Sequence, residues 1–193
     1  MITKDTQLAI TMLKKSSVGV ILTDTVYGLV ASATDVIAVK KLYALKNREQ
    51  KPGTIIASNT KQLLDLGIKQ EQLLLVEKYW PSSISIIFDL SSDFFYLHQG
   101  LGGVAIRVIS DSRLKPILDE TGPLLTSSAN HPGEPTAISI KEAFACFGDL
   151  ADFYLDGGTV IEGLPSTILK LSENNIKILR KGKDFNKIAN SLS

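Results

Sequence analysis

The chain has 193 residues, of which 44% are hydrophobic and 21% are charged. These proportions are typical of one globular domain and exclude collagen-like, coiled-coil and wholly disordered classes. Lys and Arg number 21 against 20 Asp and Glu, a net charge of +1, so no global basic field exists for nonspecific nucleic-acid binding.

Other features of the composition bear on the compartment. The single Cys excludes an internal disulfide. No apolar stretch approaches the roughly 20 residues that a membrane helix needs, and the N-terminus lacks the features of a signal peptide. We therefore expect a cytoplasmic protein without membrane contact.

Apolar periodicity predicts helices and strands in alternation along the chain. Asp5 or Thr6 caps a helix that runs to about Lys15, and the β-branched run 18–22 follows as a buried strand. Asp35 opens a second helix, and residues 54–58 form the next strand. Further helices are predicted at 61–66, 71–79, 112–120 and 141–147, and further strands at 83–89, 104–109, 124–127, 153–155, 167–171 and 176–180.

This interleaving predicts an α/β layer structure. The segment 172–175 between the last two strands is too short for a crossover helix, so at least one strand pair is antiparallel and the sheet is mixed. No linker or repeat interrupts the chain, which predicts a single domain over residues 1–193 with a polar C-terminal tail at 183–193.

Several familiar motifs are absent or misplaced. Walker A, Gly-x-Ser-x-Gly and His-Glu-x-x-His patterns do not occur. Residues 100–105 match the letters of a dinucleotide fingerprint, but a predicted strand follows them where the fingerprint needs a helix. His98, His131 and Cys146 lack metal-ligand spacing, so we expect no protein-ligated metal.

Three polar segments are candidates for a ligand site. Thr-Asp-Thr-Val-Tyr-Gly at 23–28 directly follows a buried strand, where a sheet presents residues to a ligand crevice. Residues 46–51 contain three cations, which suits a phosphate clamp, and 126–133 contain small residues that let backbone amides approach an anion. Taken alone, each segment is better explained by a turn or a solvated helix end than by a ligand site.

Two arginines interrupt apolar strands. Arg107 and Arg180 each need a partner if they are buried, either an internal carboxylate or the carboxylate or phosphate of a ligand. Strand alternation also allows each of them to face solvent. Ser166, after the turn Gly-Leu-Pro, begins a predicted strand and carries little information by itself.

Six motifs in order are the most informative feature of the chain. Thr-Asp-Thr-Val-Tyr-Gly, Lys-x-Arg, Val-Ala-Ile-Arg, Ser-Ala-Asn-x-x-Gly, Pro-Ser-Thr and Leu-Arg-Lys-Gly together resemble the YrdC/TsaC family of threonylcarbamoyl-AMP synthases in its single-domain form. The resemblance spans residues 7–182. It implies a twisted, mixed parallel and antiparallel sheet with flanking helices and a deep, positively charged cavity.

The resemblance also implies a reaction. The family makes L-threonylcarbamoyl-AMP from L-threonine, bicarbonate or CO2, and ATP, releasing pyrophosphate, for the modification of tRNA adenosine next to the anticodon. It implies Mg²⁺ with ATP, no bound organic cofactor, and partner proteins of the TsaD, TsaB and TsaE kind, with direct tRNA contact allowed but not required. Such nucleotidyl transfer depends on positioning and electrostatic stabilisation, so it needs no general-base His.

Site residues follow from the matched motifs. The resemblance assigns ATP binding to Lys46, Arg48, Lys51, Asn130, Thr136 and Arg180, of which Lys46 and Arg48 are also catalytic. It assigns L-threonine binding to Thr25, Tyr27, Arg107, Ser128 and Ser166, with Arg107 on the carboxylate and Tyr27 as a cavity wall. The chain departs from the family pattern at Leu22, Glu49, Gly53 and Ile109, and a short spacing after Arg48 leaves the register of Lys51 open.

Two other functions remain as alternatives. The first is a non-catalytic nucleotide-binding or RNA-binding module of the same fold, although the net charge of +1 argues against RNA as the main ligand. The second is a carbamoyl-adenylate activity like that of hydrogenase-maturation carbamoyltransferases. It ranks last, because the zinc-finger-like and acylphosphatase regions of those larger chains have no counterpart in this sequence.

Overall fold

The computed structural model describes residues 1–47, 50–161, 163–172 and 175–189. Its strands are β1 Ile2–Thr3, β2 Gly19–Leu22, β3 Tyr27–Ser32, β4 Thr54–Ala57, β5 Ile84–Asp89, β6 Gly103–Val108, β7 Leu124–Ser128, β8 Phe153–Leu155, β9 Thr167–Ser172 and β10 Asn175–Arg180. Its α-helices are α1 Thr6–Leu13, α2 Val36–Lys46, α3 Gln70–Val76, α4 Phe95–His98, α5 Lys115–Thr121, α6 Ile140–Phe147 and α7 Asn186–Ala189. Short 3-10 helices occupy 60–66, 77–79, 92–94 and 148–150.

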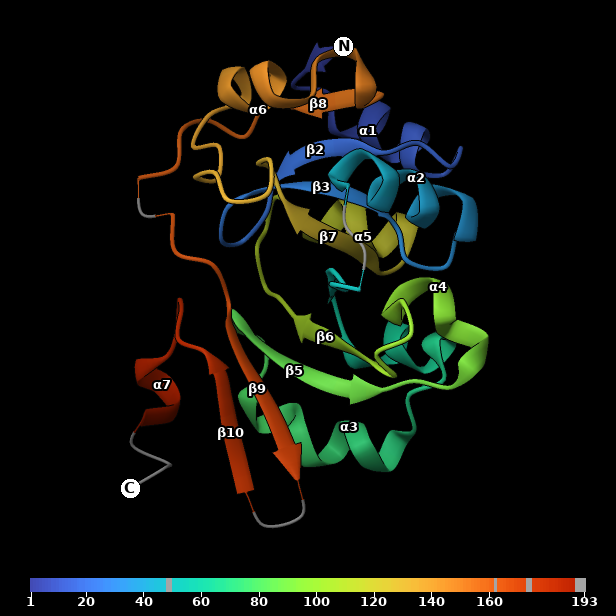
Figure 1. Ribbon diagram of the computed structural model, residues 1–193, viewed down its shortest axis with the longest axis vertical. Coiled ribbons are helices and arrows are strands. Elements are labelled where there is room, and N and C mark those ends of the chain that lie inside the picture. Colours follow the sequence, from blue (N-terminus) through green and yellow to red (C-terminus); the bar gives the residue numbers. More distant parts are fainter. Residues whose placement is uncertain (48–49, 162, 173–174, 190–193) are drawn as a thin grey trace.

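The described strands form one sheet in the order β1-β8-β2-β3-β7-β4-β6-β5-β9-β10. The pairs β1/β8, β2/β8, β4/β6 and β5/β9 are parallel, and the others are antiparallel. The sheet twists strongly, so that β9 and β10 stand steeply inclined to β2 and β3 (Figure 1). This arrangement confirms the predicted α/β class with a mixed sheet and flanking helices.

Local sequence signals place most elements. Asp5 and Asp35 cap α1 and α2 as predicted, each accepting hydrogen bonds from two backbone N–H groups through its Oδ1 atom. Asn47 ends α2 with a left-handed backbone (φ 46°), which fixes the direction of the chain directly after Lys46.

Strand β3 was not predicted. All six of its residues are buried, so the run Tyr-Gly-Leu-Val-Ala-Ser shows no alternation between polar and apolar positions. The predicted helix at 61–66 is a 3-10 helix, the one at 112–120 begins only at Lys115, and α4 was not predicted.

Helices cover both faces of the central strands. Successive residues point to opposite faces: Leu29 of β3 and Leu125 of β7 join the core under α2, α4 and α6, whereas Val30 and Leu124 join the core under α1 and α5. Where helices cover both faces, these strands carry apolar side chains on both faces. None of the described helices has the length and apolar character that crossing a membrane requires.

Candidate functional site

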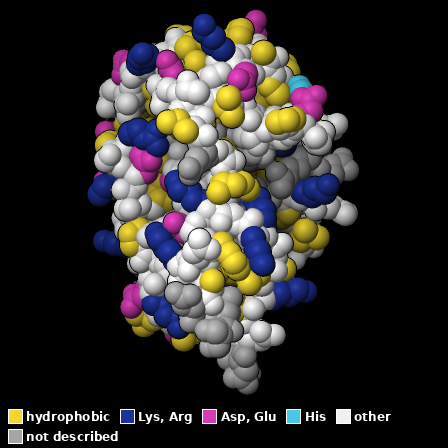
Figure 2. Space-filling view, turned by 90° about the vertical axis from the view of Figure 1, so that its left-hand side faces the viewer, with side chains coloured by type: hydrophobic (Ala, Val, Ile, Leu, Met, Phe, Trp, Pro, Cys, Tyr) yellow, Lys and Arg dark blue, Asp and Glu magenta, His cyan; other side chains and the backbone are white. Residues whose placement is uncertain are grey.

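A cavity of about 520 Å³ opens on the α1/α5 side of the sheet, beyond the ends of those two helices. The strands change character along this face. In β7 the residues facing this side run from Leu124 to Thr126 and Ser128, and in β4 they run from Ile56 to Thr54. Apolar side chains meet the helices, and hydroxyls line the cavity once the helices end. Lys and Arg side chains gather around the middle of the face that Figure 2 shows, which is the left-hand side of Figure 1.

Arg107 lies deep in this cavity and is paired internally. The residue is only 2% exposed, and Nη2 donates to Oδ1 of Asp24 at 2.5 Å while Nε lies 3.1 and 3.2 Å from the two carboxylate oxygens. Asp24 also accepts a hydrogen bond from the Ser83 hydroxyl at 2.9 Å. Of the two partners that the sequence left open for Arg107, the structure contains the internal carboxylate.

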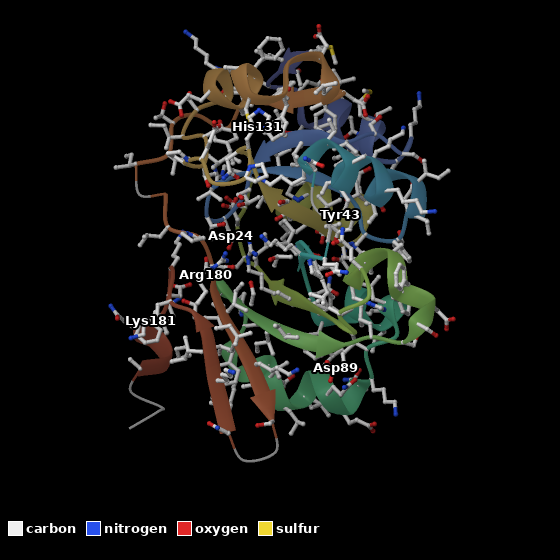
Figure 3. All side chains as sticks on the ribbon, in the orientation of Figure 1. Asp24, Tyr43, Asp89, His131, Arg180 and Lys181 are labelled. Atoms are coloured by element: carbon white, nitrogen blue, oxygen red, sulfur yellow. The ribbon has the colours of Figure 1, made fainter. Side chains whose placement is uncertain are left out.

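Ser166 and Arg180 form the second polar group of the site. Ser166, just before β9, is 3% exposed, and exposed Arg180 at the end of β10 donates from Nε to its carbonyl at 2.9 Å and from Nη2 to its hydroxyl at 3.0 Å. Asp24 and Arg180 lie in the same region, between strands β2 and β3 on one side and strands β9 and β10 on the other (Figure 3).

The C-terminal segment holds this group in place. Lys183 Nζ donates to the backbone oxygen of Asp24 at 2.7 Å, and Asp184 accepts from the Ser83 N–H at 2.9 Å. Burial alone would raise the pKa of Asp184, but the hydrogen bond from Ser83 and the nearby cation of Lys187 outweigh it and lower that pKa. Gly182 lies so close to the chain before β9 that a Cβ there would be 2.1 Å from a backbone oxygen.

Lys46 is directed at the loop after β7. It is 5% exposed, and its Nζ donates to the Ser128 carbonyl at 2.8 Å, to the Asn130 side-chain oxygen at 2.7 Å and to the Asn130 carbonyl. The Ser128 hydroxyl also donates to that side-chain oxygen at 2.7 Å. Lys46 therefore joins the end of α2 to the loop that carries two other predicted site residues.

The other predicted residues divide into two sets. Thr25 lines the cavity with its hydroxyl 3.0 Å from that of Thr23, and Ser128, Arg107, Ser166 and Arg180 line it too. Thr136 and Lys51 are not among its lining residues. Arg48 lies outside the described residues.

Tyr27 does not form a wall of the cavity, contrary to the expectation from the sequence. Gly28, its neighbour in β3, faces the cavity, so the Tyr27 ring points to the opposite face and is buried in the core. Its hydroxyl donates to the Gly158 carbonyl at 2.6 Å and accepts from the Gly157 N–H at 3.1 Å. Burial raises the pKa of this phenol, so it stays neutral and supports the chain before β9.

Some lining residues were missed in the sequence. Lys170, Asp89 and Leu101 come from β9, β5 and the turn before β6. Only the register of distant strands brings them together: Lys170 lies opposite Ile87, and Asp89 lies opposite Gly103. The alternation of β9 was the one available signal, because it places Lys170 on the same face as Ile168.

Comparisons with known proteins now identify the family. The model of the Sua5/YciO/YrdC family, described as "Telomere recombination", matches residues 11–182. The chain belongs to this family. The resemblance seen in the sequence is thereby confirmed.

Its relatives are named as synthases. A putative threonylcarbamoyl-AMP synthase of Mycobacterium leprae is 33% identical over 178 residues, covering 90% of this chain and 81% of that protein. The threonylcarbamoyl-AMP synthase of Bacillus subtilis is 31% identical, covering 93% of this chain and 54% of the relative. These likenesses make the chain an enzyme of the Sua5/YciO/YrdC family.

Solved structures agree with the fold. P. abyssi Sua5 complexed with L-threonine superimposes with a TM-score of 0.81 at 27% identity, covering 92% of this chain and 54% of that one. The E. coli YciO structure matches with a TM-score of 0.77 at 20% identity, which supports the fold alone. The chain thus spans about half the length of that Sua5 structure and of the B. subtilis relative.

Proposed function

We propose that this chain synthesises L-threonylcarbamoyl-AMP from L-threonine, bicarbonate or CO2, and ATP, with release of pyrophosphate. One observation carries the proposal: the sheet of this family leaves one face open as a cavity with hydroxyls on its walls and arginines at two depths. A site for a small zwitterion and a polyphosphate needs these groups, because carboxylates and phosphates are bound by hydroxyls and guanidinium forks.

The proposed reaction has two bond-forming steps. The threonine amine adds to the carbon of CO2 and loses a proton, which gives a carbamate. A carbamate oxygen then bonds to the α-phosphorus of ATP while the bond from that phosphorus to the bridging oxygen breaks, and pyrophosphate leaves with the electron pair. This makes the enzyme a nucleotidyltransferase.

The chain contributes by binding and by charge. Arg180 and Lys170 stand at the exposed part of the cavity, where they would stabilise negative charge on the phosphates. Thr25, Ser128 and Ser166 supply hydroxyls for the amino acid, and Lys46 with Asn130 shapes the loop beside them. Arg48 and Lys51 belong to this proposal as ATP-binding residues, and Lys46 and Arg48 as the catalytic pair.

We assign Mg²⁺ to the nucleotide. Among the described residues no three His, Cys, Asp or Glu side chains come together as ligands, so these residues do not fit a resident metal. The proposed ion is carried by the phosphate oxygens of ATP, where it would offset part of their charge.

The first test is an amino-acid survey. The purified protein is incubated with ATP and Mg²⁺, with or without bicarbonate, and with L-threonine, L-serine or no amino acid. Pyrophosphate is measured and the adenylate identified by mass spectrometry. We expect pyrophosphate and a threonylcarbamoyl adenylate only when threonine and bicarbonate are both present; pyrophosphate that forms equally without them would refute the proposal.

A matched pair of variants tests the nucleotide site. Arg180→Ala should raise the KM for ATP about 10-fold to 100-fold, because a hydrogen bond to a charged group contributes about 1.5–3 kcal/mol. Lys177 also lies on β10 but is not among the cavity-lining residues, so Lys177→Ala should leave that KM within about twofold. Equal effects of the two substitutions would place the phosphates elsewhere.

The product would act in tRNA modification next to the anticodon. We propose that it passes to proteins of the TsaD, TsaB and TsaE kind in the cytoplasm, with direct tRNA contact not required. Addition of such proteins and tRNA to the assay should transfer the threonylcarbamoyl group to adenosine, whereas the chain alone with tRNA should not.

A further inference from the structure

Two buried serines connect the two arginines of the cavity. Ser85 of β5 is fully buried, Ser166 is 3% exposed, and the parallel pairing of β5 with β9 brings their hydroxyl oxygens to 3.0 Å. Arg107 Nη1 lies 3.5 Å from the Ser85 oxygen, and Arg180 Nη2 lies 3.0 Å from the Ser166 oxygen. The order Arg107, Ser85, Ser166, Arg180 is thus one continuous row of hydrogen bonds.

The chemistry of arginine sets the direction of every bond in this row. A guanidinium has only donors, whereas a hydroxyl has one donor and two acceptor positions. Ser85 therefore accepts from Arg107 and donates its one proton to Ser166. Ser166 accepts from both Ser85 and Arg180, so both of its acceptor positions are used.

The proton of Ser166 consequently points away from the row. In the described part of the chain no acceptor for it lies within hydrogen-bond distance. A buried hydroxyl proton without an acceptor is costly, and native proteins rarely contain one unless a ligand or water completes it. Because Ser166 lines the cavity, its proton is available to a ligand there.

We propose that Ser85 is a positioning residue that holds Ser166 as a hydrogen-bond donor to the carboxylate of the amino-acid substrate. This inference rests on the proposed function and deepens it, since Ser85 itself would touch no substrate. Without Ser85, the acceptor position of Ser166 that Ser85 occupied is empty, so the hydroxyl could turn its proton there instead of into the cavity, and the donor would be lost part of the time.

Depth and charge favour a carboxylate over a phosphate at this point. Ser166 and Arg107 are 3% and 2% exposed, so only a compact group reaches them. Asp24 already offsets the charge of Arg107 through a close ion pair, so this deep region lacks the surplus positive charge that a polyphosphate needs. The exposed cations Arg180 and Lys170 are better placed for a polyphosphate.

A double-mutant cycle separates positioning from a purely structural role. The KM for threonine and the KM for ATP are measured for the unaltered protein, Ser85→Ala, Ser166→Ala and the double variant, with thermal unfolding of each. Ser32→Ala is the matched control: Ser32 is also a buried strand serine, but among the described residues its hydroxyl bonds only to Thr34. If Ser85→Ala does not fold, Ser85→Cys, of similar volume and a weak donor, replaces it.

We expect Ser85→Ala to raise the KM for threonine about 10-fold and to leave the KM for ATP within twofold. The double variant should be no worse than Ser166→Ala, because Ser85 acts only through Ser166. Ser32→Ala should change neither KM.

Three results would overturn the inference: an unchanged KM for threonine in folded Ser85→Ala, a larger rise for ATP than for threonine, or additive effects in the double variant. Failure of the proposed function looks different, because the unaltered protein would then form no threonine-dependent adenylate, and that result would remove both proposals.

Discussion

The buried ion pair between Asp24 and Arg107 makes the sharpest prediction about stability. Their side chains are 10% and 3% exposed, and the carboxylate meets both Nε and Nη2 of the guanidinium. Asp24→Asn keeps the shape but removes the charge, and its NH2 group cannot accept from the guanidinium. Arg107 would be left buried without a counter-charge.

The magnitude follows from that burial. Breaking a buried pair by removing one partner costs about 3–5 kcal/mol, a large part of the roughly 5–15 kcal/mol that stabilises a domain. At about 2–4 °C per kcal/mol for a chain of this size, Asp24→Asn should lower the melting temperature by about 6–20 °C. Glu120→Gln removes the negative charge from the exposed pair with Lys14 and should cost less than about 1 kcal/mol.

Urea unfolding at pH 7 measures both variants. The single tryptophan, Trp80, packs against Phe88 of β5 and reports the unfolding by its fluorescence. Replacing both charged partners, Asp24→Asn with Arg107→Met, should recover much of the loss, because no unpaired charge stays buried. A cost for Asp24→Asn no larger than that of Glu120→Gln would refute the reasoning, and so would a double variant less stable than the single one.

Three further predictions concern the support of the site. Tyr27→Phe should lower the unfolding free energy by about 1–3 kcal/mol, since two peptide groups lose a partner, yet leave the KM for threonine unchanged; a raised KM would restore Tyr27 as a cavity wall. Gly53→Ala places a Cβ 2.5 Å from a backbone oxygen of β7 and should cost about 1–3 kcal/mol in chemical denaturation, whereas Gly163→Ala, with 3.8 Å of room, should be neutral. The folded-state pKa of Asp184 is lowered, so its stabilisation is present above the unfolded value of about 3.9 and is lost as pH falls through the folded one. Asp184→Asn should therefore be less stable than the unaltered protein at pH 7, and melting curves of the two should approach each other as the pH falls below the unfolded value of about 3.9.

Elements with a local cause could be predicted from the sequence. Asp5 and Asp35 cap their helices because a carboxylate satisfies N–H groups only two and three residues away. The antiparallel pairing of β9 with β10 follows from the short segment between them. In contrast, β3 has two covered faces, so its pattern carries no period, and its first two residues, Tyr27 and Gly28, were assigned to the polar segment 23–28.

The site depends on contacts that no local pattern encodes. Asp24 and Arg107 are 83 residues apart, and Ser85 and Ser166 are 81 apart. A lone arginine in an apolar strand indicates that a partner exists, but the choice between an internal carboxylate and a ligand depends on which loop the fold brings to it. Motif order identified the family and with it the lining residues Thr25, Ser128 and Arg180; it could not indicate Ser85, whose only signal is a serine within an apolar strand.

Three of the four departures from the family pattern have local explanations, and the fourth, Glu49, lies outside the described residues. Ile109 stands where proline is usual, and its N–H donates to the Ala57 carbonyl at 3.0 Å, a bond that proline cannot make and that extends the pairing of β4 with β6. Leu22 packs against Gly157, where a Cβ would lie 2.6 Å from the Leu22 Cβ. Gly53 lets its backbone approach β7, and its N–H donates to the Tyr43 hydroxyl at 3.1 Å. Each of these three residues contacts backbone or core atoms. The departures therefore change the surroundings of the cavity and leave its row of hydroxyls and arginines intact.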